Sequence, residues 1–531
     1  STGWAQWIVR DDGPTISRMF AESFFRNLAF TPRQSDFELT KFDFDKDPAR
    51  LEAIHRMLDA TDTDLAAFRE RGGKALMYYG WADPALNPMM GVNYYEDVLK
   101  RMASELVKVL AMPEFRQTVE KDGSVVGGPV ADQFESHVRA DHERWGKVIR
   151  DARGEVLRSA AVFHYHAGEI LMPRGEIYPS ESPDTFLYTV ERPLGVVCAI
   201  TPWNFPFAIP AWKLAPAIGL GNTVVWKPAL DASGSAVFLA RLMLEAGLPA
   251  GVVNLITGRG GALSGALSGD PRLAGVTFTG SGPVGAGLRQ AVADRNVKVQ
   301  LELGGKNPIV VLADADLGDA AQQIAKGAMF GTGQRCTASS RLYVESPVAD
   351  ELTARIVAEV ERLRVGDPFD PSVDVGPLSS PAQHRKVGEY LDLARAEGAD
   401  SLIGGGLEAE CFVQPTVLRG VSAESRLLRE EIFGPVLAIE EVADFDAAVA
   451  SANDTSFGLS SSVFTADLAK ALAFTEATES GMVHVNRETG GVEAHVPFGG
   501  IKESSNMSRE HGPAARHFFT TTKTVYVRTP G

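Results

Sequence analysis

The chain has 531 residues, of which 44% are hydrophobic and 23% are charged, and its formal net charge is −16. This composition is typical of a globular protein of roughly two to four domains, and the acidic balance argues against a general binder of nucleic acid or of anionic membranes. Three cysteines (Cys198, Cys336 and Cys411) are too few for a disulfide framework and fit a reducing compartment. No apolar run reaches the ~18 residues of a membrane span and no signal peptide is visible. We therefore expect a cytoplasmic protein with neither membrane nor nucleic acid among its partners, and we assign no metal ligands.

Residues 1–103 are rich in aromatic residues and carry both signs of charge. Their pattern predicts a buried strand over residues 74–79 that ends in the turn Gly80-Trp81-Ala82-Asp83-Pro84. The text from residue 71 to residue 84 resembles the C-terminal part of the tannase and feruloyl esterase family. On that resemblance Asp83 takes the place of the acid in a catalytic triad.

The resemblance does not extend to esterase activity. Residues 1–103 contain no Gly-x-Ser-x-Gly or Cys-Ser-x-Gly-Gly turn, so the segment lacks a nucleophile. Tyr79 stands where the family has a histidine. Because an orienting acid cannot act alone, we interpret Asp83 as a turn residue.

Residues 104–151 change character again and have helical spacing at both ends. Met112-Pro113-Glu114 and the run from Arg144 to Ile149 make them similar to the C-terminal end of periplasmic tricarboxylate-binding proteins, without that family's ligand cleft. Residues 1–151 are thus interpreted as pieces of two other families ahead of the remaining chain. A gene rearrangement, an assembly artefact and an adaptive fusion all stay open as origins.

From Ala152 onwards, helices alternate with short apolar strands, which predicts an α/β fold with a parallel, doubly wound sheet. An extended arm over residues 178–192 comes before the sheet. The strands are expected at residues 195–200, 223–226, 252–256, 275–278 and 297–302.

A second alternating block follows Gly305. Its strands are expected at residues 309–312, 342–344, 435–441 and 461–463. The chain ends in a run of β-formers over residues 521–528 that has little core of its own, so we expect it to add to another sheet.

The stretch from Glu302 to Cys336 carries the most specific chemistry. It begins Glu302-Leu303-Gly304-Gly305-Lys306 and ends Gly333-Gln334-Arg335-Cys336. Glycines beside each reactive side chain let a backbone approach closely, and a thiol becomes a good nucleophile once a base supplies its thiolate. The stretch resembles the Glu-Leu-Gly-Gly-Lys and Gly-Gln-x-Cys signatures of the aldehyde dehydrogenases, at that family's spacing.

The resemblance runs from about Ala152 to the C-terminus. It implies an NAD(P)-binding domain over residues 152–302, with the arm at 178–192 used for oligomerisation, and a catalytic domain over residues 303–495. A return segment and an oligomerisation tail over residues 496–531 would complete a homodimer or homotetramer, in which the tail pairs across a dimer. Residues 1–151 would be an unrelated α/β extension.

The family's catalytic roles carry over to three residues. Cys336 as thiolate attacks the aldehyde, and hydride leaves to the nicotinamide, which gives a thioester that water activated by Glu302 hydrolyses. Asn204, in Pro202-Trp203-Asn204-Phe205-Pro206, would donate to the oxyanion together with the backbone N–H of Cys336. Cys198 and Cys411 lack such settings, so we interpret them as structural.

Eight residues are the cofactor contacts that the resemblance implies. Lys227 would contact the adenosine ribose, Ser281 the pyrophosphate at a glycine-rich turn, and Glu431 the nicotinamide ribose. Leu230 stands where the family often has a glutamate that binds the ribose hydroxyls, so NADP is favoured over NAD. The full set is Trp203, Lys227, Gly280, Ser281, Gly285, Leu303, Glu431 and Phe433.

The substrate is harder to predict. The sequence around Cys336 and the run His495-Val496-Pro497-Phe498 resemble the α-ketoglutaric and succinic semialdehyde branch, and an aromatic or aliphatic aldehyde is the competing choice. Arg335 and Arg341 could attract a substrate carboxylate, or either could be a structural ion-pair partner. The alternative to a dehydrogenase is an inactive fusion product, because the roughly hundred residues that usually come before this match in the family are replaced.

Overall fold

The computed structural model describes residues 148–172 and 175–528. The strand and turn expected around Asp83, and almost all of the helical segment over residues 104–151, lie outside the described residues. The elements described below belong to one compact unit of the chain.

The first sheet has five parallel strands in the order β5-β4-β3-β6-β7. Because the strand order reverses at β3, this is the doubly wound arrangement that the sequence predicts, in which ligands bind outside the carboxyl ends of the strands. The strands are β3 (Val196–Thr201), β4 (Thr223–Pro228), β5 (Val253–Leu255), β6 (Leu273–Thr279) and β7 (Lys298–Glu302).

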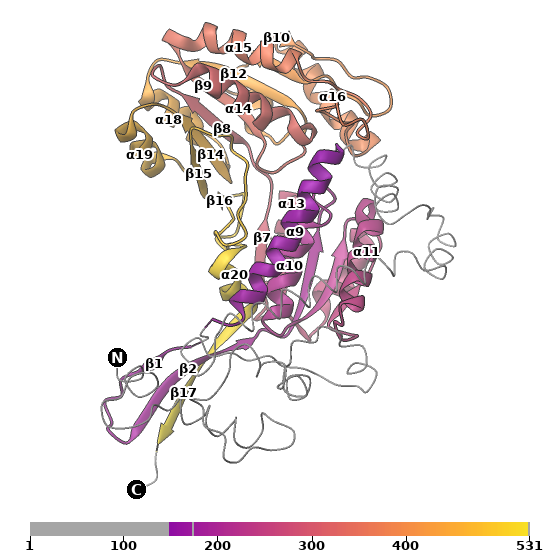
Figure 1. The fold of residues 1–531 in the computed structure, drawn as a ribbon, viewed down its shortest axis with the longest axis vertical. Helices are drawn as coiled ribbons and strands as arrows, with labels where there is room; N and C mark the ends of the chain where they lie inside the picture. Colours follow the sequence, from indigo (N-terminus) through magenta and orange to yellow (C-terminus); the bar gives the residue numbers. More distant parts are fainter. Residues whose placement is uncertain (1–147, 173–174, 529–531) are drawn as a thin grey trace, which may run out of the picture. The chain divides into compact units, whose positions relative to one another are not determined.

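Helices cover this sheet, and α9 lies along α10 (Figure 1). The core beneath them includes Val197, Leu214 and Trp226, which are 0% exposed. The Trp226 indole donates to Thr201 Oγ1 at 3.0 Å, so its polar atom is satisfied in the core. The helices are α9 (Ile149–Glu169), α10 (Ala208–Gly219), α11 (Ser233–Glu245), α12 (Gly260–Gly269) and α13 (Gly282–Ala291).

The second sheet has seven strands in the order β10-β11-β12-β9-β8-β14-β15. All neighbouring pairs are parallel except β10 with β11 at the edge. The strands are β8 (Asn307–Val311), β9 (Ser339–Glu345), β10 (Asp400–Ile403), β11 (Thr416–Arg419), β12 (Val436–Val442), β14 (Ser460–Phe464) and β15 (Met482–Val485).

Its helices are α14 (Leu317–Met329), α15 (Ala349–Glu361), α16 (Pro381–Ala396), α17 (Arg426–Arg429), α18 (Phe445–Asn453) and α19 (Leu468–Ala477). Strands buried on both faces read as continuous apolar runs, which is why Ile309 to Leu312 could be recognised in the sequence. Two short strands, β13 (Phe457–Gly458) and β16 (Ile501–Lys502), pair separately, and α20 (Gly512–Phe519) leads into the last strand.

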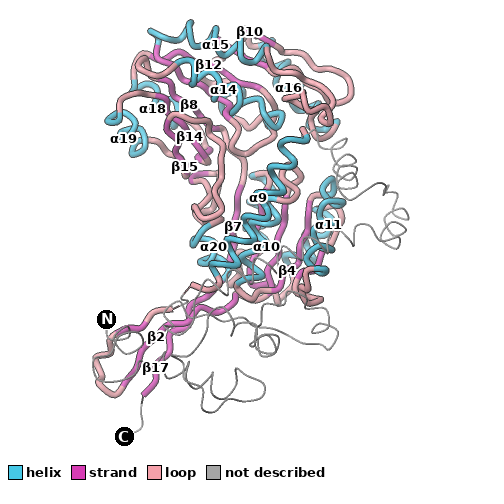
Figure 2. The backbone as a smooth tube through the Cα atoms, viewed as in Figure 1, coloured by secondary structure: helices cyan, strands magenta, loops and turns pink. Residues whose placement is uncertain are grey.

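The expected arm is a three-stranded antiparallel sheet of β1 (Ile177–Tyr178), β2 (Thr185–Pro193) and β17 (Thr520–Arg528). The register of β17 against β2 runs from Thr520 opposite Pro193 to Arg528 opposite Thr185. Figure 2 shows these two long strands side by side. Within its own chain, β17 adds to the arm at an edge of β2. The expectation that the tail pairs across a dimer stays a prediction.

Candidate active site

Cys336 follows an irregular turn at the start of β9. Gly331, Thr332 and Gly333 have φ values of 63°, 56° and 63°, a left-handed run that is costly for a β-branched residue. The Thr332 hydroxyl donates to the carbonyl of Gly376 at 3.0 Å, which helps to hold that conformation. A Cβ on Gly333 would lie 2.2 Å from the carbonyl oxygen of Gly434, so only glycine fits there.

The two ends of the Glu302–Cys336 stretch meet in the structure. Asn307 Nδ2 donates to the carbonyl of Cys336 at 2.8 Å. A Cβ on Gly305 would lie 2.4 Å from that same carbonyl oxygen. The second glycine of the motif thus allows the cysteine turn to pack directly on the chain that leaves β7.

Glu302 ends β7 and is 2% exposed. Its Oε1 accepts from Ser505 Oγ at 3.1 Å, whereas Oε2 has no hydrogen-bond partner among the described residues. Burial, followed by the negative charge of Glu510, raises the pKa of Glu302 well above its ordinary value. A carboxylate of raised pKa is a stronger base, as proton abstraction near neutral pH requires.

The surroundings of Cys336 favour the neutral thiol. Burial, then the charges of Glu431 and Glu302, raise its pKa to about 12. The side chain packs beside an apolar cluster that includes Trp212 and Phe498. Formation of the nucleophilic thiolate therefore requires a base or a nearby positive charge.

Asn204, the predicted oxyanion donor, lies beside the same turn. Its Nδ2 donates to the carbonyl of Gln334, two residues before Cys336, at 3.0 Å. The loop after β3 is thereby tied to the cysteine turn of the second sheet. The structure brings Asn204, Glu302 and Cys336 into one region.

A buried ion pair behind Glu302 escaped the sequence analysis. Lys213 on α10 is 0% exposed and pairs with Glu510, and its Nζ also donates to Thr277 Oγ1 at 2.9 Å. The charge of Lys213 opposes the rise in the pKa of Glu302 that Glu510 helps to cause. The available signal was a lone lysine within the otherwise apolar run of residues 208–219, because a buried charge requires a partner.

The candidate nicotinamide contacts gather next to the glycine pair. Glu431 Oε1 accepts from the backbone N–H of Gly305 at 2.9 Å, and a Cβ on Gly304 would lie 2.5 Å from Glu431 Oε2. Phe433, at φ 60°, packs edge-to-face on Trp203 with 5.6 Å between ring centroids. The fold thus brings Phe433 against Trp203 and Glu431 against the glycine pair, although these residues are far apart in sequence.

The remaining cofactor candidates lie at the carboxyl edge of the first sheet. Lys227 is the second-to-last residue of β4, where burial lowers its pKa. Ser281 is the N-cap of α13, and its side chain makes no capping hydrogen bond, so the first-turn N–H groups can receive an anion. Gly280 donates to the carbonyl of Glu302 at 3.1 Å, and a Cβ on Gly285 would meet Leu303 at 2.7 Å. This chemistry fits a dinucleotide that lies along the edge.

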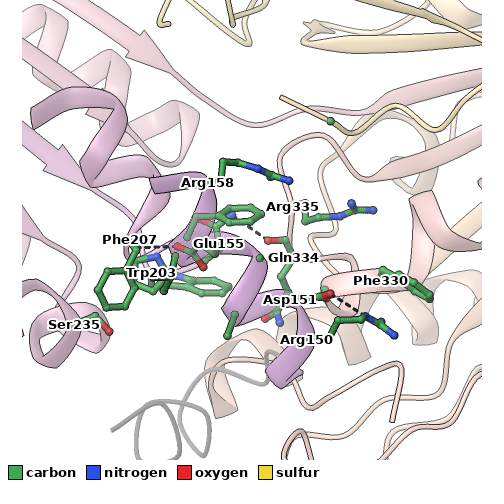
Figure 3. A pocket seen from close by; sticks show the side chains of 18 of the residues that line it. Arg150, Asp151, Glu155, Arg158, Trp203, Phe207, Ser235, Phe330, Gln334 and Arg335 are labelled. Carbon is green, nitrogen blue, oxygen red and sulfur yellow. Dashed lines mark hydrogen bonds and ion pairs between the residues drawn. The ribbon is translucent and has the colours of Figure 1, made fainter. Parts of the chain in front are cut away.

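A cavity of about 460 Å³ opens beside Asn204. Trp203, Phe207 and Phe330 form apolar parts of its wall, and Gln334 and Arg335 form polar parts (Figure 3). Substrate pockets commonly combine an apolar wall with a few polar groups. The cavity is the candidate entrance for the aldehyde.

Only one of the two arginines singled out in the sequence lines this cavity. Arg335 does so and pairs with Glu488 at 3.2 Å. Arg341 is 1% exposed and donates to the carbonyls of Lys306 and Ala452, both at 3.0 Å. Arg341 therefore has a structural setting made of backbone carbonyls, whereas the sequence offered an ion pair as its structural alternative. Cys198 is buried, which matches its structural interpretation.

A thiol and a buried carboxyl in one region between two α/β sheets, beside a sheet edge suited to a dinucleotide, are typical of an active site in an α/β enzyme. The aldehyde dehydrogenase family model matches residues 130–525, and the protein belongs to that family of oxidoreductases. The match begins at residue 130 rather than at about 152 as predicted. The tannase and feruloyl esterase model matches residues 1–120 rather than 1–103. The resemblance of residues 104–151 to tricarboxylate-binding proteins stays a prediction.

Named relatives and solved structures agree with the family. The chain is 42% identical over 389 residues to α-ketoglutaric semialdehyde dehydrogenase of Bacillus subtilis, covering 72% of this chain and 80% of that protein. It is 45% identical over 388 residues to α-ketoglutarate semialdehyde dehydrogenase of Haloferax volcanii, with the same coverage. Betaine aldehyde dehydrogenase of Staphylococcus aureus, solved in complex with NAD+, matches with a TM-score of 0.72 and 32% identity over 75% of this chain and 79% of that one. An NADP-dependent enzyme of E. coli matches with a TM-score of 0.73 and 34% identity over 75% and 83%.

The described residues also give information on membrane-spanning helices and on metal sites. Among the described residues, no helix is long and apolar enough to cross a membrane. Nor does that part of the chain hold a group of three or more His, Cys, Asp or Glu side chains arranged to bind a metal ion.

Proposed function

We propose that the protein oxidises a short, carboxylate-bearing semialdehyde, α-ketoglutaric or succinic semialdehyde, to the acid with NAD(P)+ through a thioester on Cys336. Aldehyde oxidation is the activity of its family. The observation that carries the proposal is the contact of three distant segments at one point: Asn204 donates to the cysteine turn, and Asn307, just after the Glu302 motif, donates to Cys336 itself.

Each residue has a distinct part in the proposed reaction. Cys336 Sγ gives its proton to a water molecule and bonds to the aldehyde carbon. The carbonyl oxygen becomes an oxyanion that Asn204 Nδ2 and the Cys336 N–H stabilise. Bound NAD(P)+ supplies the acceptor for the hydride that leaves this carbon. Glu302 then takes a proton from the water that attacks the resulting thioester. The C–S bond breaks, and the carboxylic acid and the Cys336 thiolate are released.

Lys227, Ser281, Glu431, Trp203 and Phe433 would hold the cofactor, together with Gly280, Gly285 and Leu303 that shape the edge. NADP is the favoured form, with NAD as the other candidate. Leu230, which is 52% exposed just after β4, presents no carboxylate to repel a 2′-phosphate.

We infer that the protein is a cytoplasmic homodimer or homotetramer. Support comes from the arm, where Ile177, Phe186 and Tyr526 are 74%, 50% and 71% exposed. Exposed apolar side chains on adjacent strands are typical of a surface that another protein surface covers.

The test is formation of reduced cofactor from succinic and α-ketoglutaric semialdehydes, with NAD and NADP in parallel and Cys336→Ala as the control. We expect turnover that vanishes in the variant. A folded wild-type protein that turns over no aldehyde in a wider panel, with either cofactor, would overturn the proposal and support the alternative of an inactive fusion product.

A further inference from the structure

The cavity beside Asn204 has a charge balance opposite to that of the whole chain. Five basic side chains line it against three acidic ones, whereas the chain as a whole carries a formal charge of −16. An excess of cations at the entrance of a site attracts anionic ligands. The lining cations are Arg150, Arg158, Lys326, Arg335 and Arg487, and the anions are Asp151, Glu155 and Glu488.

Three of the five cations are already engaged by acids. Lys326 and Arg335 share Glu488, at 3.1 Å and 3.2 Å. Arg150 lies 3.5 Å from Asp151 and 3.7 Å from Asp374. These charges are largely balanced within the protein.

Glu155 is not available to balance the remaining cations. Its Oε1 accepts from the backbone N–H groups of Phe207 and Ala208, at 2.8 Å and 3.0 Å, where it caps the start of α10. Figure 3 shows the Glu155 side chain turned towards Phe207. Glu155, the acidic residue of α9 nearest in sequence to Arg158, therefore uses its Oε1 to bind the backbone of α10.

Arg158 and Arg487 are left without an ion-pair partner in the part of the chain that the structure describes. Arg158 extends from α9 on the side of the cavity where Arg335 lies (Figure 3). It is close enough to the buried His511 to act on it electrostatically. His511 packs on Trp212 and Phe498, in the cluster that also contacts Cys336. Arg158 also lines the same cavity as Gln334 and Arg335, the two residues that come directly before Cys336.

Arg487 reaches the cavity from the second sheet. Its backbone is anchored just after β15, where Ser462 Oγ donates to its carbonyl at 2.6 Å. Its guanidinium folds over Gly491, where a Cβ would lie 2.5 Å from Nη2. The two guanidinium groups, which have no ion-pair partner among the described residues, therefore come from different parts of the fold and line one cavity.

We propose that Arg158 and Arg487 form the subsite that recognises the distal carboxylate of the substrate. The inference rests on the proposed function and assigns the charge selectivity of the same site to two residues of this chain. A guanidinium binds a carboxylate through paired, charge-assisted hydrogen bonds. The aldehyde end then points to Cys336, and the carboxylate end stays at the mouth of the cavity.

Steady-state kinetics of Arg158→Gln, Arg487→Gln and the double variant test the assignment. Succinic semialdehyde is compared with butanal, a neutral aldehyde of the same chain length. Because both arginines are solvent-exposed, we expect each substitution to raise KM for the semialdehyde about 5- to 20-fold. KM for butanal should change less than about twofold, and kcat for the semialdehyde should stay within about threefold.

Arg150→Gln is the matched control, because Arg150 lines the same cavity but is paired with Asp151 and Asp374. Equal KM changes for the two aldehydes, or an Arg150→Gln effect as large as that of the other two, would overturn the assignment. Failure of the proposed function looks different: the wild-type protein would then oxidise neither aldehyde.

A second measurement keeps the test decisive if a variant folds poorly. Glutarate is titrated as an inhibitor of butanal oxidation by the wild-type protein at increasing salt concentration. We expect competitive inhibition that weakens as salt screens the exposed arginines. Glutarate that does not inhibit, or inhibits independently of salt, would argue against the subsite.

Discussion

The carboxyl edge of the first sheet and the cysteine turn of the second sheet are built in different ways. At the edge, Lys227 lies within the last two residues of β4, and Ser281 comes two residues after the end of β6. The turn before Cys336 has three consecutive residues at positive φ, and it is held by contacts from Asn307, Gly376 and Gly434. The positions of the candidate cofactor-binding residues at the edge are set by local structure. The position of the nucleophile is set by several segments that are distant in sequence.

The largest effect should come from the base that faces the turn. We expect Glu302→Gln to lower steady-state turnover about 10³-fold, because an amide cannot take a proton from water. Hydride transfer does not require this carboxylate, so rapid mixing should show a burst of close to one reduced cofactor per site. Normal steady-state turnover of this variant would show that Glu302 is not the base for thioester hydrolysis.

The second prediction concerns the backbone of the turn. Gly333→Ala places a Cβ against the Gly434 carbonyl at φ 63°, so we expect kcat to fall about 100-fold as the turn shifts. Gly420→Ala is the control, since Gly420 has φ 73° and nothing within 4 Å of its Cβ position. It should cost about 1 kcal/mol of unfolding free energy, measured by denaturant titration, and leave kcat unchanged. Similar kinetics for the two variants would contradict the steric account.

The third prediction concerns the edge of the first sheet. Leu230→Glu places a carboxylate beside the ribose site proposed for Lys227, so we expect KM for NADP to rise about 10-fold relative to KM for NAD. Leu244→Glu is the matched control, because Leu244 is 53% exposed and Leu230 is 52% exposed. If the ratio of KM for NADP to KM for NAD does not change, Leu230 does not determine which cofactor the protein prefers.

The smallest effect is a shift in pH dependence. Glu302 must be deprotonated to act, so activity falls as pH drops through its pKa, which the charge of Glu510 raises. Glu510→Gln removes that charge, and the acidic limb of kcat should therefore move to lower pH, by roughly one unit. The exposed Glu503, in the same segment, gives the control Glu503→Gln, which should leave the limb in place. A limb that moves to higher pH would contradict this electrostatic coupling.

The sequence predicted the parts of the molecule that rest on local patterns. The alternation of strands and helices and the arm could be inferred from periodicity and turn signals. The approach of Glu302 to Cys336 was implied by the family resemblance of the two motifs. The Lys213–Glu510 pair could not, because its partners lie on α10 and just before α20 and meet only when both pack behind Glu302. The role of Arg341 was equally hidden, since its acceptors are backbone carbonyls such as those of Lys306 and Ala452.

The partner of the tail could not be predicted either, because a run of β-formers does not specify which edge it joins. The pairing of β17 with β2 has a consequence for the order of events in the cell. The ribosome completes residue 193 long before it reaches residue 520, so the arm lacks its third strand throughout most of synthesis. Any subunit association that uses the finished arm must follow the synthesis of residues 520–528. Two nascent chains on one messenger RNA are thereby kept from joining prematurely through this sheet.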